Sequence, residues 1–296
     1  MIIPEQVLIE TVNGKCTVKC IMCGISDWTR KPNIMNKDVF IAILEKLKPY
    51  QKRIPLLTLF GCGEPLLDKG LSEKIRIAKK MGFIGLGFAS NCTELYEDRS
   101  RELIEAGLDT IICSIDGIKS ETHEAIRIGA NFEKIVRNFR NFIEIRNKIG
   151  KTKVLIRFVR QEINKHEWTS FLAYWRKEIN KDYGDEVIRF DVHNWGNTVE
   201  GYNLKDVNRE TCKDKIICNE LSIKLLIRSR GEMAFCDADD NGFFELGNAI
   251  VEDPIKIYNN EIFKKYRTFM KNGRISELEY CKDCTIPRSL LLKECH

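Results

Sequence analysis

The sequence predicts an α/β protein with an open, partial (β/α)6 TIM-like barrel, followed by a smaller α+β domain. Six apolar segments of strand length alternate with amphipathic segments of helical length between residues 7 and 192. Such alternation indicates right-handed βαβ crossovers and a parallel sheet. Residues 56–60 are apolar nearly throughout, as expected for a strand covered by helices on both faces. Six units are too few to close an eight-stranded barrel, so we expect an open, curved sheet.

The expected elements follow from the spacing of the apolar residues. Strands are predicted where short apolar runs stand between turn residues, at 7–12, 56–60, 84–89, 110–115, 154–159 and 187–192. Helices are predicted where apolar residues recur every three or four positions, at about 37–48, 71–82, 98–107, 132–143 and 168–175. Asn36 can cap the first helix and Pro49 ends it. Loops that follow the strands of such a barrel meet at one end, so their residues should face one cavity.

Composition limits the classes of protein to which the chain can belong. Its 296 residues, 43% of them hydrophobic, can bury a large core, and the sequence has no run of eighteen apolar residues and no signal-peptide pattern. Basic and acidic residues alternate and the formal charge is only +5, which argues against nucleic-acid and membrane partners. Twelve cysteines without a secretion signal suit a reducing compartment. We therefore expect a soluble, cytoplasmic protein whose cysteines serve metal or redox chemistry.

Three cysteines near the N-terminus give the first chemical signal. Cys16, Cys20 and Cys23 are spaced by three and then two residues, soon after the first predicted strand. Thiolates at this spacing can bind one [4Fe–4S] cluster, and three ligands leave its fourth iron open to another molecule. A zinc site is the alternative, because two cysteines separated by two residues also form half of many zinc sites.

This run of cysteines resembles the motif of the radical S-adenosylmethionine (radical SAM) family. The resemblance implies that the open iron binds the amino and carboxylate groups of S-adenosylmethionine. Reductive cleavage of that molecule would then give a 5′-deoxyadenosyl radical. The resemblance also implies that Met22, just before the third cysteine, lies against the adenine.

A second motif follows the second predicted strand. Gly61, Cys62, Gly63, Glu64 and Pro65 resemble the GGEP motif with which the family binds the amino group of S-adenosylmethionine. Two glycines let the backbone approach a ligand closely, and a glutamate offers a carboxylate to an ammonium. Cys62 either packs as a small buried side chain or places a thiol near the radical site. A zinc-stabilised interaction protein would not explain why both motifs lie at successive strand ends.

Further polar residues at strand ends complete the predicted S-adenosylmethionine site. The resemblance implies that Ser90, Asn91, Ser114 and Asp116 meet the methionyl carboxylate and the ribose. The last two could instead cap the following helix.

Two arginines and the end of the sixth strand are also candidates. Arg127 either meets the ligand carboxylate or lies on the surface. Arg157, flanked by apolar residues on a strand, should find a carboxylate of the ligand or of a neighbour, because an unpaired buried guanidinium is costly. A substrate could contact His193 and Trp195, although a structural role beneath the second domain is an equal alternative.

A second set of cysteines follows a change of pattern near residue 200. The mostly polar residues 197–217 suit a linker between a barrel at 1–196 and a smaller domain at 218–296. Residues 221–227 and 232–235 are predicted to form a β-hairpin, and a helix is predicted at about 261–272. Four cysteines flank these elements and could saturate an iron–sulfur cluster, with a structural zinc as the alternative; they are Cys218, Cys236, Cys281 and Cys284.

This second set resembles the SPASM and twitch domains of radical SAM enzymes, in particular the twitch-type group that includes the butirosin-pathway dehydrogenase. Cys218, Gly231 and Cys236 fit the start of the pattern, but position 290, where the full SPASM pattern continues with a cysteine, is leucine. The resemblance therefore implies one auxiliary [4Fe–4S] cluster. Cys212 and Cys295 are the spare candidates for its ligands.

Together, these resemblances imply a radical SAM oxidoreductase that abstracts hydrogen from a substrate carbon. We expect oxidation of a sugar or aminocyclitol alcohol, with the auxiliary cluster as electron acceptor. The alternative is modification of a ribosomal peptide by thioether formation, epimerisation or side-chain oxidation. An epimerase would need a thiol hydrogen donor, for which Cys62, Cys92, Cys113 and Cys212 are available. Either reaction requires an external electron donor, such as a flavodoxin or a ferredoxin.

Overall fold

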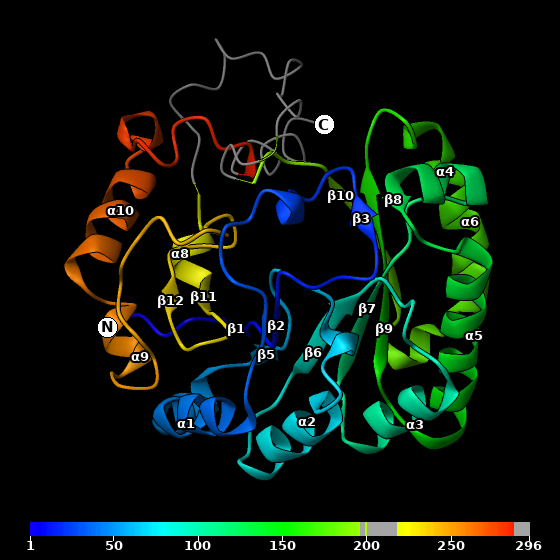
Figure 1. Ribbon diagram of the computed structural model, residues 1–296, viewed down its shortest axis with the longest axis horizontal. Coiled ribbons are helices and arrows are strands. Elements are labelled where there is room, and N and C mark those ends of the chain that lie inside the picture. Colours follow the sequence, from blue (N-terminus) through cyan, green and yellow to red (C-terminus); the bar gives the residue numbers. More distant parts are fainter. Residues whose placement is uncertain (196–198, 200–217, 287–296) are drawn as a thin grey trace.

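The computed structural model describes residues 1–195, 199 and 218–286 (Figure 1). Six parallel strands lie side by side in chain order, each hydrogen-bonded to the next. They are β1 (Gln6–Ile9), β5 (Leu56–Thr58), β6 (Leu86–Ser90), β7 (Thr110–Ser114), β9 (Lys153–Arg160) and β10 (Glu186–Asp191). The predicted α/β class and partial six-unit barrel are therefore confirmed.

Helices cover the outer face of this sheet (Figure 1). They are α1 (Lys37–Leu47), α2 (Leu71–Lys80), α3 (Glu97–Glu105), α5 (Phe132–Ile149) and α6 (Trp168–Glu178). Their apolar faces form the core with the strands, and Phe40, Phe139 and Trp175 are almost fully buried there. The Asn36 side chain caps α1 as predicted, accepting a 2.7 Å hydrogen bond from the Asp38 N–H.

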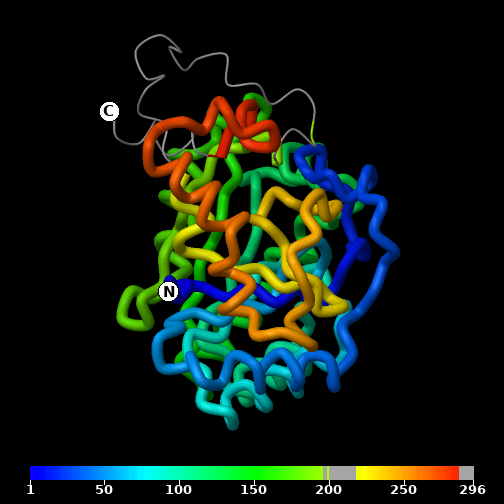
Figure 2. The backbone as a smooth tube through the Cα atoms, turned by 90° about the vertical axis from the view of Figure 1, so that its left-hand side faces the viewer, coloured from blue at the N-terminus to red at the C-terminus, as the bar shows by residue number. Residues whose placement is uncertain are grey.

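The C-terminal segment extends the same sheet. Strand β11 (Lys224–Ile227) runs parallel to β1, with Gln6 opposite Lys224 and Ile9 opposite Ile227. Strand β12 (Met233–Ala234) completes the predicted hairpin. Residues 221–223 were expected to begin its first strand, but they belong to the short helix α8 (Glu220–Ile223), because periodicity does not separate helix from strand in so short an apolar run. Helices α9 (Pro254–Ile257) and α10 (Glu261–Lys271) then pass beside the N-terminus (Figure 2).

Short elements at the barrel end were not predicted. The expected strand at 7–12 ends at Ile9, and β2 (Val12–Asn13) pairs instead with β4 (Asn33–Ile34). Strand β3 (Lys19–Cys20) pairs with β8 (Arg127–Ile128), which follows α4 (Ser120–Ile126). These strands have two residues each, which is too short to show the alternation of apolar and polar residues that predicts a strand. The short 3-10 helices are η1 (Gly24–Ser26), η2 (Lys48–Arg53), η3 (Pro65–Leu67), η4 (Lys165–Glu167), η5 (Lys181–Tyr183) and η7 (Ile275–Glu277).

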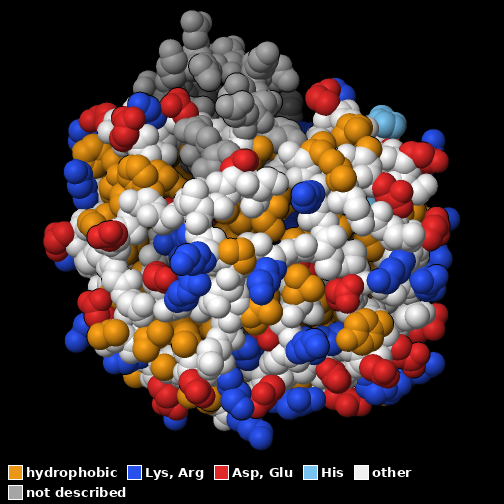
Figure 3. Space-filling view, viewed as in Figure 1, with side chains coloured by type: hydrophobic (Ala, Val, Ile, Leu, Met, Phe, Trp, Pro, Cys, Tyr) orange, Lys and Arg blue, Asp and Glu red, His pale blue; other side chains and the backbone are white. Residues whose placement is uncertain are grey.

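The surface carries charges of both signs. Acidic and basic side chains are interspersed over the face seen in Figure 3. No helix among the described residues is long and apolar enough to cross a membrane. The predicted linker at 197–217, apart from residue 199, and the spare cysteines Cys212 and Cys295 lie outside the described residues.

A fully buried ion pair fastens the end of α5 to the start of β10. The Asp185 carboxylate accepts two hydrogen bonds from Arg146, at 2.7 and 2.9 Å, and others from the backbone N–H groups of Val154 and Asn180. We expect Asp185→Ala to lower the free energy of unfolding of the metal-free, reduced protein by about 3–5 kcal/mol, because it leaves a buried guanidinium unpaired. Urea unfolding measures this loss.

The matched control is Glu279→Ala, which removes an exposed ion pair with Lys282 and should leave the free energy of unfolding nearly unchanged. Equal losses in the two variants would contradict the assignment of Asp185 as a structural anchor.

Candidate functional site

The first three cysteines lie on the loop that follows β1 and β2, at the end of the barrel where the parallel strands terminate. Cys16, Cys20 and Cys23 are all partly buried. The Asn91 side-chain amide donates to the Cys16 sulfur at 3.5 Å, and the Arg127 guanidinium donates to the Cys20 sulfur at 3.5 Å. Burial raises the pKa of Cys16, and it raises the pKa of Cys23 to about 12. Thiolates here would therefore require a nearby positive centre, which iron supplies.

The buried Glu64 carboxylate gathers several of the predicted residues. It accepts a 2.7 Å hydrogen bond from the Ser90 hydroxyl, a 2.9 Å bond from the Asn91 N–H and a 3.1 Å bond from the Leu66 N–H. Burial raises the pKa of Glu64, although these donors oppose the rise. Glu64, Ser90 and Asn91, all predicted to contact S-adenosylmethionine, thus lie together at adjacent strand ends, and Asn91 also reaches Cys16, a predicted cluster ligand.

The two glycines of this motif approach the chain itself. A Cβ on Gly63 would lie 2.7 Å from the Val12 carbonyl oxygen, and one on Gly61 would lie 2.8 Å from the Glu10 side chain. A larger residue at either position would displace the start of the cysteine loop. Pro65 begins the 3-10 helix η3, which Glu64 caps.

Ser114, Asp116 and the two candidate arginines form a second polar group. Asp116 is fully buried, forms a 2.7 Å ion pair with Arg127 and accepts a hydrogen bond from the Val159 N–H. Neither Ser114 nor Asp116 caps α4, whose N-cap is Lys119. Arg127 is buried and not a surface residue.

Arg157 differs from the expectation of a carboxylate neighbour. Its guanidinium donates a 2.7 Å hydrogen bond to the Ser114 hydroxyl, and no carboxylate of the described residues lies within ion-pair distance. Burial lowers the pKa of Arg157, and the neighbouring Arg127 cation adds to this shift. A ligand carboxylate is therefore the remaining candidate partner.

Sequence reasoning missed a buried network around Glu10, at the end of β1. Its carboxylate binds the Arg30 guanidinium through two hydrogen bonds, at 2.7 and 2.9 Å, and accepts from the N–H groups of Cys62 and Ser229. Burial alone would raise the pKa of Glu10, but Arg30 and these donors outweigh it and lower the pKa. The only sequence signal was an acidic residue within an apolar strand.

Cys62 joins this network to the C-terminal segment. Its thiol donates to the Asp240 carboxylate at 3.0 Å, and Arg30 donates to the Asp240 carbonyl oxygen. Burial raises the pKa of Asp240 to about 6, although the Cys62 and Arg30 contacts oppose the rise. Cys62 is thus both buried and hydrogen-bonded. Two further cysteines, Cys92 and Cys113, are fully buried with their sulfurs 3.0 Å apart.

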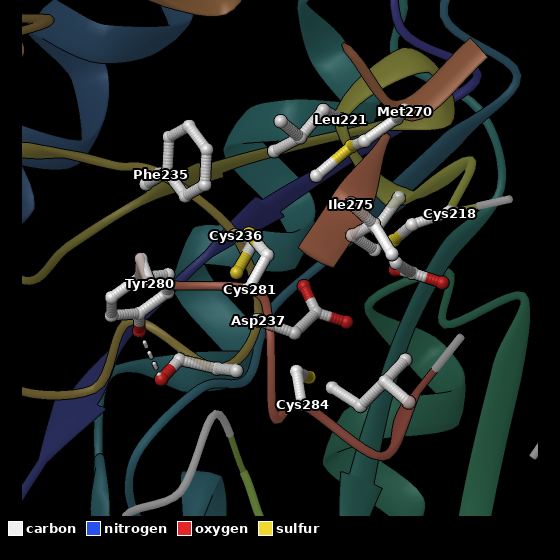
Figure 4. Close-up of a pocket in the computed structure, with 13 residues that line it drawn as sticks. Cys218, Leu221, Phe235, Cys236, Asp237, Met270, Ile275, Tyr280, Cys281 and Cys284 are labelled. Atoms are coloured by element: carbon white, nitrogen blue, oxygen red, sulfur yellow. Dashed lines mark hydrogen bonds between the residues drawn. The ribbon is translucent and has the colours of Figure 1, made fainter. Parts of the chain in front are cut away.

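The four later cysteines line one cavity. Figure 4 shows Cys218, Cys236, Cys281 and Cys284 around a single space, with the Asp237 carboxylate directed into it. The rest of the wall is mostly apolar and includes Leu221, Phe235, Met270 and Ile275. Burial raises the pKa of Cys218 to about 12 and also raises that of Cys236 and Cys281.

The four cysteines of this cavity suit an iron–sulfur cluster. Among the residues that the structure describes, no three His, Cys, Asp or Glu side chains converge closely enough to hold one metal ion. A single zinc ion requires such convergence. In a [4Fe–4S] cluster each thiolate binds a separate iron, so the sulfurs stand farther apart around the cube. Four thiols around an apolar space therefore fit a cluster.

Charged residues adjoin this cavity. Lys224 forms ion pairs of 2.7 Å with Glu220 and 2.8 Å with Asp237. Burial lowers the pKa of His193 to about 4, opposed by the Asp237 carboxylate and reinforced by the Lys224 and Arg157 cations. His193 is thus neutral at pH 7, and it lies near enough to Arg157, Lys224 and Asp237 for their charges to act on it. Sequence reasoning did not single out Glu220 and Asp237. The signal that could have identified them is their place in the chain, two residues after Cys218 and directly after Cys236.

Comparisons with known proteins agree with this geometry. Residues 11–167 match the model of the Radical SAM superfamily, and residues 218–285 match that of SPASM, an iron–sulfur cluster-binding domain. A tungsten-containing aldehyde ferredoxin oxidoreductase cofactor-modifying protein of Pyrococcus furiosus is 27% identical over 146 residues, which are 48% of this chain and 39% of that relative. This chain covers less than two-thirds of the length of each of the first curated relatives that it matches.

Two solved structures share the fold over nearly the whole chain. BtrN, solved in complex with AdoMet and 2-DOIA, has a TM-score of 0.64 at 18% identity, with 95% of this chain and 93% of BtrN covered. SuiB of Streptococcus suis, solved bound to S-adenosylmethionine, has a TM-score of 0.71 at 15% identity, with 95% of this chain and 72% of SuiB covered. Likeness at such low identity shows the fold alone.

The raised pKa of Asp240 predicts a pH-dependent stability. A carboxyl whose pKa is higher in the folded state binds more protons there, so the free energy of unfolding falls as pH rises from about 4 to about 6. We expect Asp240→Asn to remove this fall, which we estimate at about 1–3 kcal/mol, while the amide oxygen still accepts from Cys62. Urea unfolding of the metal-free protein at pH 4.5 and pH 7.5 measures the difference.

The control is Asp182→Asn, at an exposed aspartate, which should retain the pH dependence of the wild type. A pH dependence in Asp240→Asn equal to that of the wild type would disprove the role of Asp240.

Proposed function

The chain belongs to the radical SAM superfamily, and on that premise we propose that it is an oxidoreductase that removes hydrogen from a substrate carbon. We propose a sugar or aminocyclitol alcohol as the substrate and one auxiliary [4Fe–4S] cluster as the electron acceptor. The observation that carries this proposal is the single cavity lined by Cys218, Cys236, Cys281 and Cys284. Four thiols leave no iron open for a substrate, which suits electron transfer and not substrate binding.

The first cysteine set would hold the cluster that binds S-adenosylmethionine. When bound, that cluster and S-adenosylmethionine supply a 5′-deoxyadenosyl radical, which takes a hydrogen atom from the substrate. Cys16, Cys20 and Cys23 leave one iron open, as this chemistry requires. The protein contributes binding, orientation and the exclusion of water. Asn91 and Arg127 donate to two of the sulfurs and would orient those ligands, since hydrogen bonds to ligand atoms tune a metal site.

Glu64 and Arg157 would bind the two charged ends of the methionyl group. Glu64 has three donors, and a carboxylate can accept about four hydrogen bonds, so an ammonium can be added. Arg157 is held by Ser114 and has no carboxylate partner among the described residues. It suits a ligand carboxylate, because a guanidinium and a carboxylate form strong charge-assisted hydrogen bonds.

Oxidation of an alcohol to a carbonyl removes one hydrogen atom, one electron and one proton from the substrate. In the proposed reaction the cofactors, when bound, would take up the hydrogen atom and the electron, and a base or water at the cavity would take up the proton. Support for an alcohol comes from BtrN, which was solved with AdoMet and 2-DOIA. The agreement in length is also close, since each chain is covered over more than nine-tenths. The charged residues Glu220, Lys224 and Asp237 suit the recognition of a polar substrate.

A second candidate is radical modification of a ribosomal peptide. It is supported by SuiB, which was also solved bound to the precursor peptide SuiA and shares the fold over 98% of this chain. Thioether formation, epimerisation and side-chain oxidation all begin with the same hydrogen abstraction. Cys62 is hydrogen-bonded to Asp240, and Cys92 and Cys113 are fully buried, so these thiols are poorly exposed to a peptide. This argues against epimerisation, which needs a thiol hydrogen donor, and we rank the peptide candidate second.

Both candidates require an external one-electron donor, and we propose a flavodoxin or a ferredoxin. We propose a cytoplasmic location, since clusters of this kind need reduced thiols. We expect no nucleic-acid partner, because charges of both signs are mixed over the visible surface.

Glu64→Gln tests the binding of S-adenosylmethionine. We expect its affinity to fall roughly ten- to hundredfold, because a hydrogen bond to a charged group contributes about 1.5–3 kcal/mol. Isothermal titration of the anaerobically reconstituted protein measures the change. Glu97→Gln, at an exposed position of α3, is the control. An unchanged affinity in Glu64→Gln, with iron content preserved, would remove Glu64 from the ligand site.

Iron analysis tests the two clusters. We expect about eight irons per chain in the wild type, and about four both in a Cys16/Cys20/Cys23→Ala variant and in a Cys281→Ala/Cys284→Ala variant. Only the first variant should lose the formation of 5′-deoxyadenosine. Zinc at the later cysteines, with iron falling from about four to none in the first variant, would overturn the electron-acceptor role.

Incubation with candidate substrates tests the reaction. The wild type should yield 5′-deoxyadenosine and a carbonyl product from a candidate alcohol, whereas a modified peptide would favour the second candidate.

A further inference from the structure

The segment that follows β10 contacts both sets of cysteines. Asn194 is buried, and it lies against the loop that carries Cys284. The indole N–H of Trp195 donates a 3.1 Å hydrogen bond to the carbonyl oxygen of Met22, the residue before Cys23. Two consecutive residues therefore connect cysteine loops that lie more than 250 residues apart in the chain.

The contact with the second set has several hydrogen bonds. The Asn194 N–H donates to the Thr285 hydroxyl at 2.8 Å, and the Asn194 side-chain oxygen accepts from the Thr285 N–H and hydroxyl at 3.0 Å each. The Asn194 side-chain amide also donates to the Asp283 carbonyl oxygen at 3.0 Å. Asp283 and Thr285 are the neighbours of Cys284 on either side. Asn194 thus fixes the backbone from which that cysteine projects.

The backbone of Trp195 is strained. Its φ is +45°, in the left-handed region that residues other than glycine rarely adopt. Such conformations persist where the surrounding structure imposes them, and they concentrate at functional sites. Here the conformation turns the indole back over His193, with the ring centroids 4.1 Å apart, and toward Met22.

We propose that residues 193–195 form a positioning bridge that sets the separation between the two clusters. This inference rests on the proposed function, because it assumes that each cysteine set holds a cluster. In this proposal the bridge residues act by positioning the two loops. They act through Met22 on one loop and through Asp283 and Thr285 on the other. Positioning matters because a displacement of about 1 Å far from the reacting atoms can lower a rate by about 100-fold, and partners behind metal ligands orient those ligands.

Substitutions at Thr285 give a matched test. Thr285→Val removes the hydroxyl and both hydrogen bonds that it makes with Asn194, whereas Thr285→Ser keeps them. Thr268→Val removes a hydroxyl bond within α10 instead and is the control for loss of a threonine hydroxyl. Trp195→Phe keeps an aromatic ring and removes the bond to Met22. All variants are made in the full chain with both clusters reconstituted.

The measurement is the magnetic dipolar coupling between the two reduced clusters in frozen solution, which reports their separation without substrate or turnover. We expect a shifted or broadened distribution of separations in Thr285→Val and Trp195→Phe, and the wild-type distribution in Thr285→Ser and Thr268→Val. If Thr285→Val loses iron and the other variants keep it, the bridge is also supported, because that result would show that the Thr285 hydroxyl holds the Cys284 loop in place.

Several results would overturn the proposal. About eight irons with the wild-type separation in both Thr285→Val and Trp195→Phe would overturn the bridge and leave the proposed function intact. Equal changes in Thr285→Ser and Thr285→Val would exclude the hydroxyl bonds as the cause and overturn it as well. Only about four irons in the wild type would overturn the auxiliary cluster, and the bridge with it.

Discussion

The carboxylate of Glu10 is the interaction on which the arrangement of the site depends. It lies fully buried at the end of β1, between the strands β5 and β11. Three segments from different parts of the chain bind it, through Arg30, Cys62 and Ser229. A buried charge is costly unless it is paired and hydrogen-bonded, so each of these segments is required for the others to be stable. The first cysteine loop, the 61–65 motif and the end of β11 are thereby held together.

The parallel pairing of β1 with β11 has a further consequence. Parallel strands end at the same edge of a sheet, so the segments that follow β1 and β11 leave from one side of the molecule. The first cysteines follow β1, whereas Cys236 follows β12, which runs back antiparallel to β11. The two cysteine loops are connected instead by Asn194 and Trp195, which hydrogen-bond to the segment around Cys284 and to Met22.

The two cysteine sets lie in different surroundings. Charged or amide groups donate to the sulfurs of Cys16 and Cys20, and the Asp116–Arg127 ion pair lies directly behind them. The second set faces a wall that is mostly apolar, with Glu220 and Asp237 as its acidic members. Hydrogen bonds to sulfur and local charge both change the reduction potential of an iron–sulfur cluster. Two clusters in these surroundings would differ in potential, as a donor and an acceptor of electrons must.

The sequence by itself determined the local features. The period of apolar residues gave the six barrel strands and their helices, because side-chain burial repeats every two residues in a strand and nearly every four in a helix. Cysteine spacing indicated the first set, because Cys16, Cys20 and Cys23 are close in the chain. The second set is spread over residues 218–284 and was indicated by its resemblance to the SPASM and twitch pattern. The tertiary structure decided what depends on contacts between distant segments: the β1–β11 pairing, the Glu10 network and the contacts of Asn194 with Thr285. No local pattern encodes these contacts, because a buried glutamate or asparagine acquires its partner only when the whole chain has folded.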